Sequence, residues 1–498
     1  MRGIFIILFV GTLCFAKNSY SIESIDSLRV SNIHNSANLN AAFKKLFEIK
    51  AGLSKKKFVV LHFGDSHVQA GHFSGQIRRN LQSEFGNAGQ GIIFPYTLCK
   101  SFSPKGILAQ TTGQWNCTNL LKFDSSRPIG IKGYVLGTQS TGGTLSFNIT
   151  SEYAGNKTNK ISIWSSCDSV SHNYTLGDSF RLIEQYRYNE SIQVRTYELN
   201  SQIDSFRISV IPSGRGDKEF LFHGFEYVPD ALVGVDYHQL GVVGACFTHL
   251  VRSDSLVFEQ IGHIQPDLII FSYGSNESYD VQMDTTNYYN KIHGFLAKIK
   301  NGFPQTAVLI TTAPDTRSEN RTPKYLLTVN RLLKIMAADL SMSVYDLNEA
   351  MGGWGSAENW YKQDFMLKDK LHFNSKGYKL QGSMLCFDLF QLFNEQAKGH
   401  AISVDELSRE INLMLPRPEQ ANPLEGPEYQ SDGSGLRPVK NQTTGESTRK
   451  KVNYIVKKGD TITSIARKHR ADVSQILKIN GLKENTIIRP GQSISITR

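Results

Sequence analysis

Residues of the types that carry out nucleophilic catalysis occur at two distant places in the chain. Ser66 follows Gly64 and Asp65 directly after an apolar run, whereas Asp369 and His372 stand three residues apart much later in the sequence. A serine hydroxyl becomes a nucleophile when a histidine takes its proton and a carboxylate orients that histidine. The sequence therefore supplies one candidate for each role, and the chemistry that they predict is attack on a carbonyl carbon.

That reaction also needs N–H groups that stabilise the negative charge developing on the carbonyl oxygen. The segment Gly274-Ser275-Asn276-Glu277 follows another apolar run and would bring the Asn276 amide to the same place. Gly244 lies in a predicted turn, where its N–H can point inward because no Cβ obstructs it. Each short pattern alone also has a structural explanation, since a lone Asp-x-x-His is usually surface chemistry and a lone Gly-x-Asn usually a turn.

A buried strand should position the serine. Five of the six residues from 58 to 63 are apolar, too short a run for a typical helix, which predicts a parallel strand covered on both faces. A serine at the turn from this strand to a helix beginning near His72 lies at the carboxyl end of the sheet, where open α/β folds bind ligands. The free N–H groups of that helix start could hold an anion. The alternative is that Asp65 and Ser66 only cap the helix.

Strands and helices alternate in the parts of the chain on either side of residues 96–228. We expect helices at 38–48, 72–85, 288–300, 325–340 and 378–394, and strands at 58–63, 231–235, 241–245, 266–274, 307–312 and 343–347. Such alternation predicts an α/β domain with a mostly parallel sheet covered by helices on both faces.

Residues 96–228 follow a different pattern. Short alternating runs, for example 144–149, 161–164 and 206–210, are separated by clusters of Gly, Asn and Ser, which predicts a β-sandwich. Because the α/β pattern resumes afterwards, we interpret this region as an inserted domain. The predicted organisation is a signal peptide at 1–21, an α/β domain at 22–95 and 229–400, the insert at 96–228, a linker at 401–451 and a small unit at 452–498.

The first 21 residues have the pattern of a secretory signal peptide, with one arginine, an apolar run at residues 4–10 and small residues before a cleavage point after Ala16 or Ser21. The apolar run is too short to span a membrane, and no later stretch is apolar enough to do so. Leu13 before Cys14 does not suit a lipoprotein cleavage site. We therefore expect export to the periplasm or cell envelope of a bacterium, or secretion.

Cysteines and histidines give little indication of a metal site. Five cysteines remain after the predicted cleavage, an odd number without a C-x-x-C pattern, which argues against a disulfide scaffold or a zinc site. Cys99 and Cys117 are the pair to test for a bridge. His62, His67 and His72 recur every five residues, a spacing that shares no helical face, so we expect no metal there.

The order of the reactive residues resembles the SGNH branch of the GDSL esterase/lipase family. The resemblance rests on Gly64-Asp65-Ser66, Gly244, Gly274-x-Asn276 and Asp369-x-x-His372, in that order. It implies a three-layer αβα fold in which Ser66 is the nucleophile, His372 the base and Asp369 its orienting acid. The oxyanion hole would be formed by the Ser66 N–H, the Gly244 N–H and the Asn276 side chain. Gly241 is an alternative to Gly244, and Glu277 departs from the aspartate usual in the family.

The tail resembles a LysM module, a β-α-α-β unit that binds glycans containing N-acetylglucosamine, such as peptidoglycan. The resemblance covers residues 453–496, including Lys457-Lys458-Gly459-Asp460-Thr461 and Arg489-Pro490-Gly491. It implies glycan contacts from one group of residues: Gly459, Asp460, Thr461, Asn480, Pro490 and Gly491.

The positive charge belongs to the tail as well. Residues 436–498 contain 14 Lys and Arg against 4 Asp and Glu, which accounts for the whole net charge of +10, so the first 435 residues are neutral overall. In an exported protein this charge favours an anionic envelope polymer over nucleic acid as partner.

The position of the insert, and Met351-Gly352-Gly353-Trp354 ahead of the Asp-x-x-His pair, are similar to peptidoglycan O-acetylesterases. This resemblance implies removal of acetyl groups from the C6 hydroxyl of N-acetylmuramic acid through an acetyl-enzyme, with no cofactor. The alternatives are an esterase or an acetyltransferase acting on another acetylated polysaccharide. A non-catalytic peptidoglycan-binding protein is the competing class, against which the complete set of reactive residues argues.

Overall fold

The computed structural model describes residues 31–414 except 105, 123, 125, 150–157, 188–190, 217, 281, 319–322 and 398. Beyond residue 414 it describes 429–431, 436–438, 451–456, 462, 465–466, 476–477, 479–482 and 492–497. The predicted signal peptide lies outside these residues. The chain divides into two compact units, Met1–Arg437 and Pro438–Arg498.

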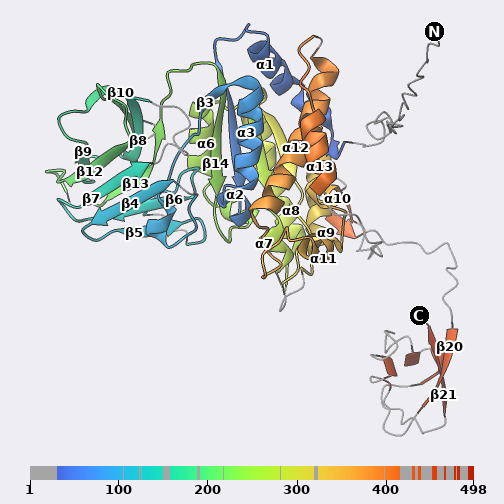
Figure 1. The fold of residues 1–498 in the computed structure, drawn as a ribbon. Helices are drawn as coiled ribbons and strands as arrows, with labels where there is room; N and C mark the ends of the chain where they lie inside the picture. The colour runs from blue at the N-terminus through green and yellow to red at the C-terminus, as the bar shows by residue number, and fades with distance from the viewer. Residues whose placement is uncertain are drawn as a thin grey trace, which may run out of the picture. The chain divides into compact units, whose positions relative to one another are not determined.

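A seven-stranded sheet forms the centre of the first unit, with the strand order β1-β17-β16-β15-β2-β14-β3 (Figure 1). Every pairing is parallel except that of β1 with β17. The strands are β1 (Ile33–His34), β2 (Lys57–Gly64), β3 (Asn87–Gly89), β14 (Gly234–Gly241), β15 (Leu268–Ser272), β16 (Ala307–Thr311) and β17 (Ser343–Tyr345).

Helices cover both faces of this sheet, so the predicted three-layer αβα architecture is confirmed. Along β2, Phe58 and Val60 join one buried cluster, whereas Leu61 and Phe63 join the other. The first cluster includes α1 (Asn40–Lys50), α3 (Phe73–Phe85) and α12 (Ser375–Gln396). The second includes α5 (Phe247–Val251), α6 (Asp254–Ile264), α8 (Thr285–Gly302) and α9 (Leu326–Asp339). Shorter elements are η2 (Ser36–Leu39), α2 (Ser66–Gln69), η3 (Tyr96–Cys99), α7 (Ser275–Ser278), α10 (Leu347–Ala350) and α11 (Ser356–Lys362).

Two antiparallel sheets form the inserted region, as the alternating pattern predicts. The six-stranded sheet has the order β10-β11-β8-β13-β6-β5 and the four-stranded sheet β4-β7-β12-β9. Between the sheets, Phe147 stacks on Phe206, and the ring of Phe225 contacts both edge to face. The strands are β4 (Ile107–Thr112), β5 (Asn116–Asn119), β6 (Tyr134–Thr138), β7 (Thr144–Ile149), β8 (Lys160–Ser166), β9 (Asn173–Thr175), β10 (Arg181–Arg187), β11 (Ile192–Glu198), β12 (Ser205–Ile211) and β13 (Phe220–Tyr227).

The start of the predicted linker is displaced. The sequence predicts a linker over residues 401–451, but α13 (Asp405–Met414) packs against α12, and Ile402 and Ile411 are buried in the core of the first unit. Val404, Leu407 and Ile411 form a narrow apolar stripe, which is easily overlooked in a segment rich in charged and polar residues. Two short strands, β18 (Tyr429–Ser431) and β19 (Leu436–Pro438), also fall in this segment.

The second unit contains the two strands at the ends of the predicted β-α-α-β module. Strand β20 (Lys451–Ile455) pairs with β21 (Ser493–Thr497) in antiparallel register. The helical residues Ile465, Ala466 and Ile476 pack with Val456 and Ile494 in a small buried core.

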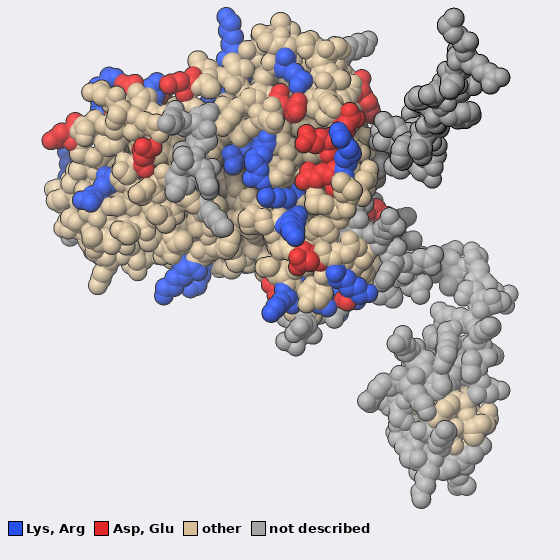
Figure 2. Space-filling model, in the orientation of Figure 1, with Lys and Arg blue, Asp and Glu red and all other residues tan. Residues whose placement is uncertain are grey.

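No helix among the described residues has the length and apolar character needed to cross a bilayer. On the face shown in Figure 2, several lysine and arginine side chains of the first unit lie together near the middle, beside a group of aspartate and glutamate side chains. This distribution agrees with the equal numbers of both charges before residue 436.

Candidate active site

The nucleophile candidate stands where β2 turns into α2. A Cβ on Gly64 would lie 2.7 Å from the carbonyl oxygen of Ser272 and 2.3 Å from a methyl group of Val68, so only glycine permits this close approach of β2, β15 and α2. Asp65 is buried and its carboxylate accepts the N–H of His67 at 2.9 Å, which caps α2. Ser66 is therefore fixed at the carboxyl end of a central strand. This position agrees both with a catalytic role for Ser66 and with a role for Asp65 in capping the helix.

The structure brings the three distant residues into one hydrogen-bonded chain. Ser66 Oγ lies 3.2 Å from His372 Nε2, and His372 Nδ1 lies 2.8 Å from Asp369 Oδ2. Asp369 Oδ1 also accepts the backbone N–H groups of Leu371 and His372, both at 3.0 Å. The carboxylate thereby fixes both the backbone and the ring of the histidine. This is the geometry by which histidine activates a serine.

Electrostatics keeps Asp369 ionised. Partial burial raises its pKa, but the hydrogen bonds from His372 and Leu371 outweigh burial and hold the pKa below its usual range. An ionised Asp369 holds the proton on His372 Nδ1, which leaves Nε2 as the acceptor that faces Ser66.

The predicted oxyanion donors line the same cleft as the reactive pair. Ser66, Gly244, Asn276 and His372 border a cleft of about 840 Å³. Gly244 has φ +78°, a conformation that favours glycine. The alternative, Gly241, ends β14 and packs against α2, where a Cβ would lie 2.2 Å from the backbone nitrogen of Gln69.

The Asn276 amide is oriented by its surroundings. Its Nδ2 donates to the carbonyl of Ala245 at 3.0 Å and lies 3.5 Å from Asp65 Oδ2. The second distance is long for a hydrogen bond, so one N–H of this amide is weakly held and can turn to a substrate oxygen. The oxyanion roles of Ser66, Gly244 and Asn276 stay predictions that this geometry permits.

Comparison with known proteins identifies two domains. The model of the GDSL-like Lipase/Acylhydrolase family matches residues 211–380, and the LysM domain model matches residues 454–497. The chain therefore carries a GDSL-like acylhydrolase domain and a LysM domain. The former is the domain of a serine ester hydrolase. Its matched range includes Gly244, Asn276, Asp369 and His372, whereas Ser66 precedes it on the other side of the insert.

One solved structure shares the fold over most of its length. A peptidoglycan O-acetylesterase is 20% identical, with a TM-score of 0.57, over 74% of this chain and 99% of the other. A lipase/acylhydrolase from Enterococcus faecalis is 17% identical, with a TM-score of 0.26, over 37% and 80% of the two chains. Among curated proteins, the endolysin of Bacillus phage PZA is 43% identical over 60 residues, which are 12% of this chain and 23% of the endolysin. The chain thus spans about a quarter of that relative.

Glu277 positions backbone segments next to the candidate active site, a role that its position after Asn276 in the sequence does not reveal. Its buried carboxylate accepts the N–H of Phe247 at 2.6 Å and that of Gly274 at 3.1 Å. Glu277 therefore joins the start of α5, which follows Gly244, to the start of α7, which carries Asn276. Burial raises its pKa to about 7, although the backbone hydrogen bonds act in the opposite direction.

His67 is a second neighbour that the sequence interpretation treated only as a potential metal ligand. Its Nδ1 lies 2.8 Å from the hydroxyl of Tyr378, and its ring centre 5.6 Å from that of His372. Burial lowers the pKa of His67 to about 3, so its ring is uncharged near neutral pH. His62 instead lies in the core, between Tyr237 and Ser272. Within the described part of the chain, no three His, Cys, Asp or Glu side chains converge on a metal site.

In the LysM domain the structure describes Asn480 among the predicted glycan contacts, whereas Gly459, Asp460, Thr461, Pro490 and Gly491 lie outside the described residues. Asn480 Nδ2 donates to the carbonyls of Ile476 and Ser495, and its Oδ1 accepts the N–H of Ser495, all at 2.8 Å. Both amide protons are used within the domain, so Asn480 stabilises the fold there, and its contact with glycan stays a prediction.

Proposed function

We propose that the protein is an exported bacterial cell-envelope esterase that removes acetyl groups from the C6 hydroxyl of N-acetylmuramic acid in peptidoglycan. The observation that carries the proposal is the hydrogen-bonded chain Ser66–His372–Asp369 at the border of an open cleft. The LysM domain supports a glycan containing N-acetylglucosamine as the polymer to which the enzyme is held.

The reaction has two halves. Ser66 Oγ attacks the acetyl carbonyl while His372 Nε2 takes its proton, and the N–H groups of Ser66, Gly244 and Asn276 hold the oxyanion. The intermediate expels the sugar oxygen, which takes the proton from His372, and acetyl-Ser66 remains. Water then attacks this ester, with His372 again as base, and releases acetate and free Ser66. A sugar hydroxyl in place of that water would give acetyl transfer, which is the alternative outcome of the same acyl-enzyme.

The disulfide supports a location outside the cytoplasm. Cys99 and Cys117, the pair selected from the sequence, are bridged, with their Cα atoms 5.3 Å apart. Such bridges form and persist in oxidising compartments, among them the bacterial periplasm and the extracellular space. The predicted signal peptide and an envelope polymer as substrate agree with that location.

The substrate is tested by a comparison of polymers. Purified enzyme should release acetate from O-acetylated peptidoglycan much faster than from acetylated xylan, and mass spectrometry of the muramidase digest should show free C6 hydroxyls on muramic acid. Faster release from xylan would assign the enzyme to another acetylated polysaccharide. Acetyl groups that reappear on a second sugar would identify a transferase.

A further inference from the structure

The inserted β domain contacts the segment that leads to Gly244. Lys132 Nζ donates to the carbonyl of Gln239 at 2.6 Å, and a Cβ on Gly133 would lie 2.3 Å from a methyl group of Val242. At Gly244 itself, a Cβ would lie 3.2 Å from a methyl group of Leu121. The insert therefore packs along the backbone from β14 to the predicted oxyanion turn.

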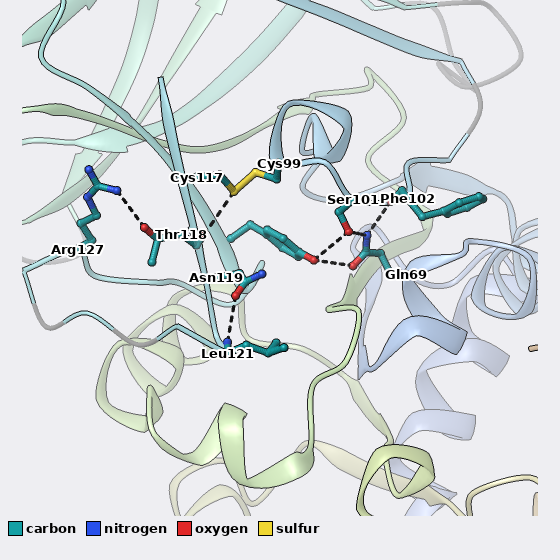
Figure 3. Close-up of a disulfide and its surroundings, with 10 residues drawn as sticks. Gln69, Cys99, Ser101, Phe102, Cys117, Thr118, Asn119, Leu121 and Arg127 are labelled. Atoms are coloured by element: carbon teal, nitrogen blue, oxygen red, sulfur yellow. Dashed lines mark hydrogen bonds between the residues drawn. A yellow bond between two sulfur atoms is a disulfide. The ribbon is translucent and has the colours of Figure 1, made fainter. Parts of the chain in front are cut away.

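One buried amide joins the insert, the nucleophile helix and this turn. Gln69 ends α2, the helix that Ser66 begins, and it is fully buried. Its Nε2 donates to Ser101 Oγ at 2.8 Å and to the carbonyl of Phe102 at 2.6 Å, contacts that can be followed in Figure 3.

The oxygen of the same amide faces the other way. Gln69 Oε1 accepts the Tyr134 hydroxyl at 2.9 Å and the N–H of Val243 at 2.8 Å. Both protons and both lone pairs of the amide are then used, so its orientation is fully determined. Val243 directly precedes Gly244, and its peptide is therefore held by a residue of the helix that begins at the nucleophile.

The disulfide fixes the insert's side of this arrangement. The Cys99–Cys117 bond ties the end of η3 to β5 (Figure 3). Ser101 and Phe102, which contact Gln69, follow η3, and Leu121, which approaches Gly244, follows β5. The covalent bond thus joins the two insert segments that approach the site.

We infer that Gln69 is a positioning residue of the oxyanion hole, and that the insert, through Tyr134 and Ser101, is part of the catalytic apparatus rather than a separable binding module. The inference rests on the proposed function in one respect, the use of the Gly244 N–H as an oxyanion donor. Such donors act only when their orientation is fixed before the reaction. Glycine at φ +78° has no side chain of its own to fix it, so the neighbouring Val243 peptide must be held from outside.

The variant Tyr134→Phe tests the inference with minimal change, because it removes one hydroxyl from the Gln69 amide. The matched control is Tyr227→Phe, since the Tyr227 hydroxyl donates to the carbonyl of Ile203 inside the insert at 3.0 Å. With 4-nitrophenyl acetate as substrate, Tyr134→Phe should lower kcat about tenfold and leave KM unchanged, because small displacements of catalytic groups are costly. Tyr227→Phe should keep the wild-type kcat and KM.

Amide hydrogen exchange of the Val243 and Gly244 N–H groups gives an independent readout. Exchange at both should be faster in Tyr134→Phe than in wild type or Tyr227→Phe. Equal kcat and equal exchange rates in Tyr134→Phe and Tyr227→Phe would overturn the inference. Gln69→Leu should lower kcat and speed exchange more than Tyr134→Phe does. It also leaves buried hydrogen-bonding groups unpaired, so the result with Tyr134→Phe decides the question if Gln69→Leu does not fold. If wild type hydrolyses 4-nitrophenyl acetate but not O-acetylated peptidoglycan, the proposed substrate fails and the inference stands. If wild type hydrolyses no ester at all, the exchange rates of the Val243 and Gly244 N–H groups alone test the inference.

Discussion

The two halves of the candidate site are held in different ways. Asp369 and His372 are partly exposed, and the carboxylate fixes the histidine through hydrogen bonds within four consecutive residues. The predicted oxyanion half is held by the buried side chains of Glu277 and Gln69, which bind the backbone of segments distant in sequence, at Phe247 and Val243 respectively. The comparison teaches that the proton-transfer half is a local motif, whereas the charge-stabilising half depends on the packing of the whole first unit, the insert included.

The largest effect should come from breaking the local half. His372→Ala removes the base and should lower kcat about as much as loss of the nucleophile, on the order of 10⁶-fold, because such residues act as a unit. Asp369→Asn keeps the base but loses the charge that fixes the His372 tautomer, and should cost about 10⁴-fold. Steady-state kinetics on a soluble acetyl ester measures both. Wild-type turnover in either variant would reject the pair.

A smaller effect is expected in the oxyanion half. Asn276→Ala removes one of three donors and should lower kcat by about 10²–10³ with little change in KM, because the donor acts mainly on the transition state. A variant with altered KM and unchanged kcat would assign Asn276 to substrate recognition. Asn287, which lines the same cleft, is the control when changed to Ala.

Glu277→Gln should affect stability and its pH dependence together. The amide cannot accept both backbone N–H groups, and one unpaired buried donor costs about 1–3 kcal/mol. Because burial raises the pKa of Glu277 to about 7, the contribution of this group to stability is full below its ordinary pKa and is lost as pH rises through 7. Urea unfolding at pH 5 and pH 8 should therefore show a smaller loss of stability with rising pH in the variant than in wild type. A pH dependence in Glu277→Gln equal to that of the control Glu358→Gln, whose side chain is about half exposed, would contradict this assignment.

The smallest effect on chemistry is expected from removal of the LysM domain. Deletion of residues 439–498 should leave kcat and KM on a soluble acetyl ester unchanged, but weaken pelleting with peptidoglycan and slow acetate release from it, because tethering raises the local substrate concentration. The electrostatic part of binding should fade at high salt. The glycan-specific part should remain and be competed by soluble N-acetylglucosamine oligomers. Binding that vanished in moderate salt and ignored those oligomers would indicate a basic patch only.

The same division explains what the sequence could predict. The sequence predicts Ser66 from its position directly after an apolar strand, and Asp369 and His372 from their spacing of three residues. The structure places all three in one hydrogen-bonded chain. By contrast, β14 was missed between two expected apolar strands, since Asp236 and His238 interrupt its apolar pattern. In the structure both side chains are buried, and Asp236 pairs with Lys57 at 2.8 Å.

No local pattern marks the supporting residues. In the sequence, Gln69 is an ordinary polar residue after a histidine and a valine. Its role follows only from its contacts with Tyr134 and Val243, which are distant in the chain. The Cys99–Cys117 bridge could be selected from the sequence because few cysteines compete for pairing. A hydrogen bond between residues far apart in the sequence, such as that of Gln69 with Tyr134, could involve any of many polar residues, so the sequence does not indicate the partner.

Acetate release from O-acetylated peptidoglycan by wild type and by Ser66→Ala tests the central claim most directly. The substitution removes a single oxygen from the start of α2, so folding and peptidoglycan binding, followed by circular dichroism and pelleting, should match wild type. Wild type should release acetate rapidly, and the variant should release none above the uncatalysed rate. Release at the wild-type rate by a correctly folded Ser66→Ala protein would contradict the central claim.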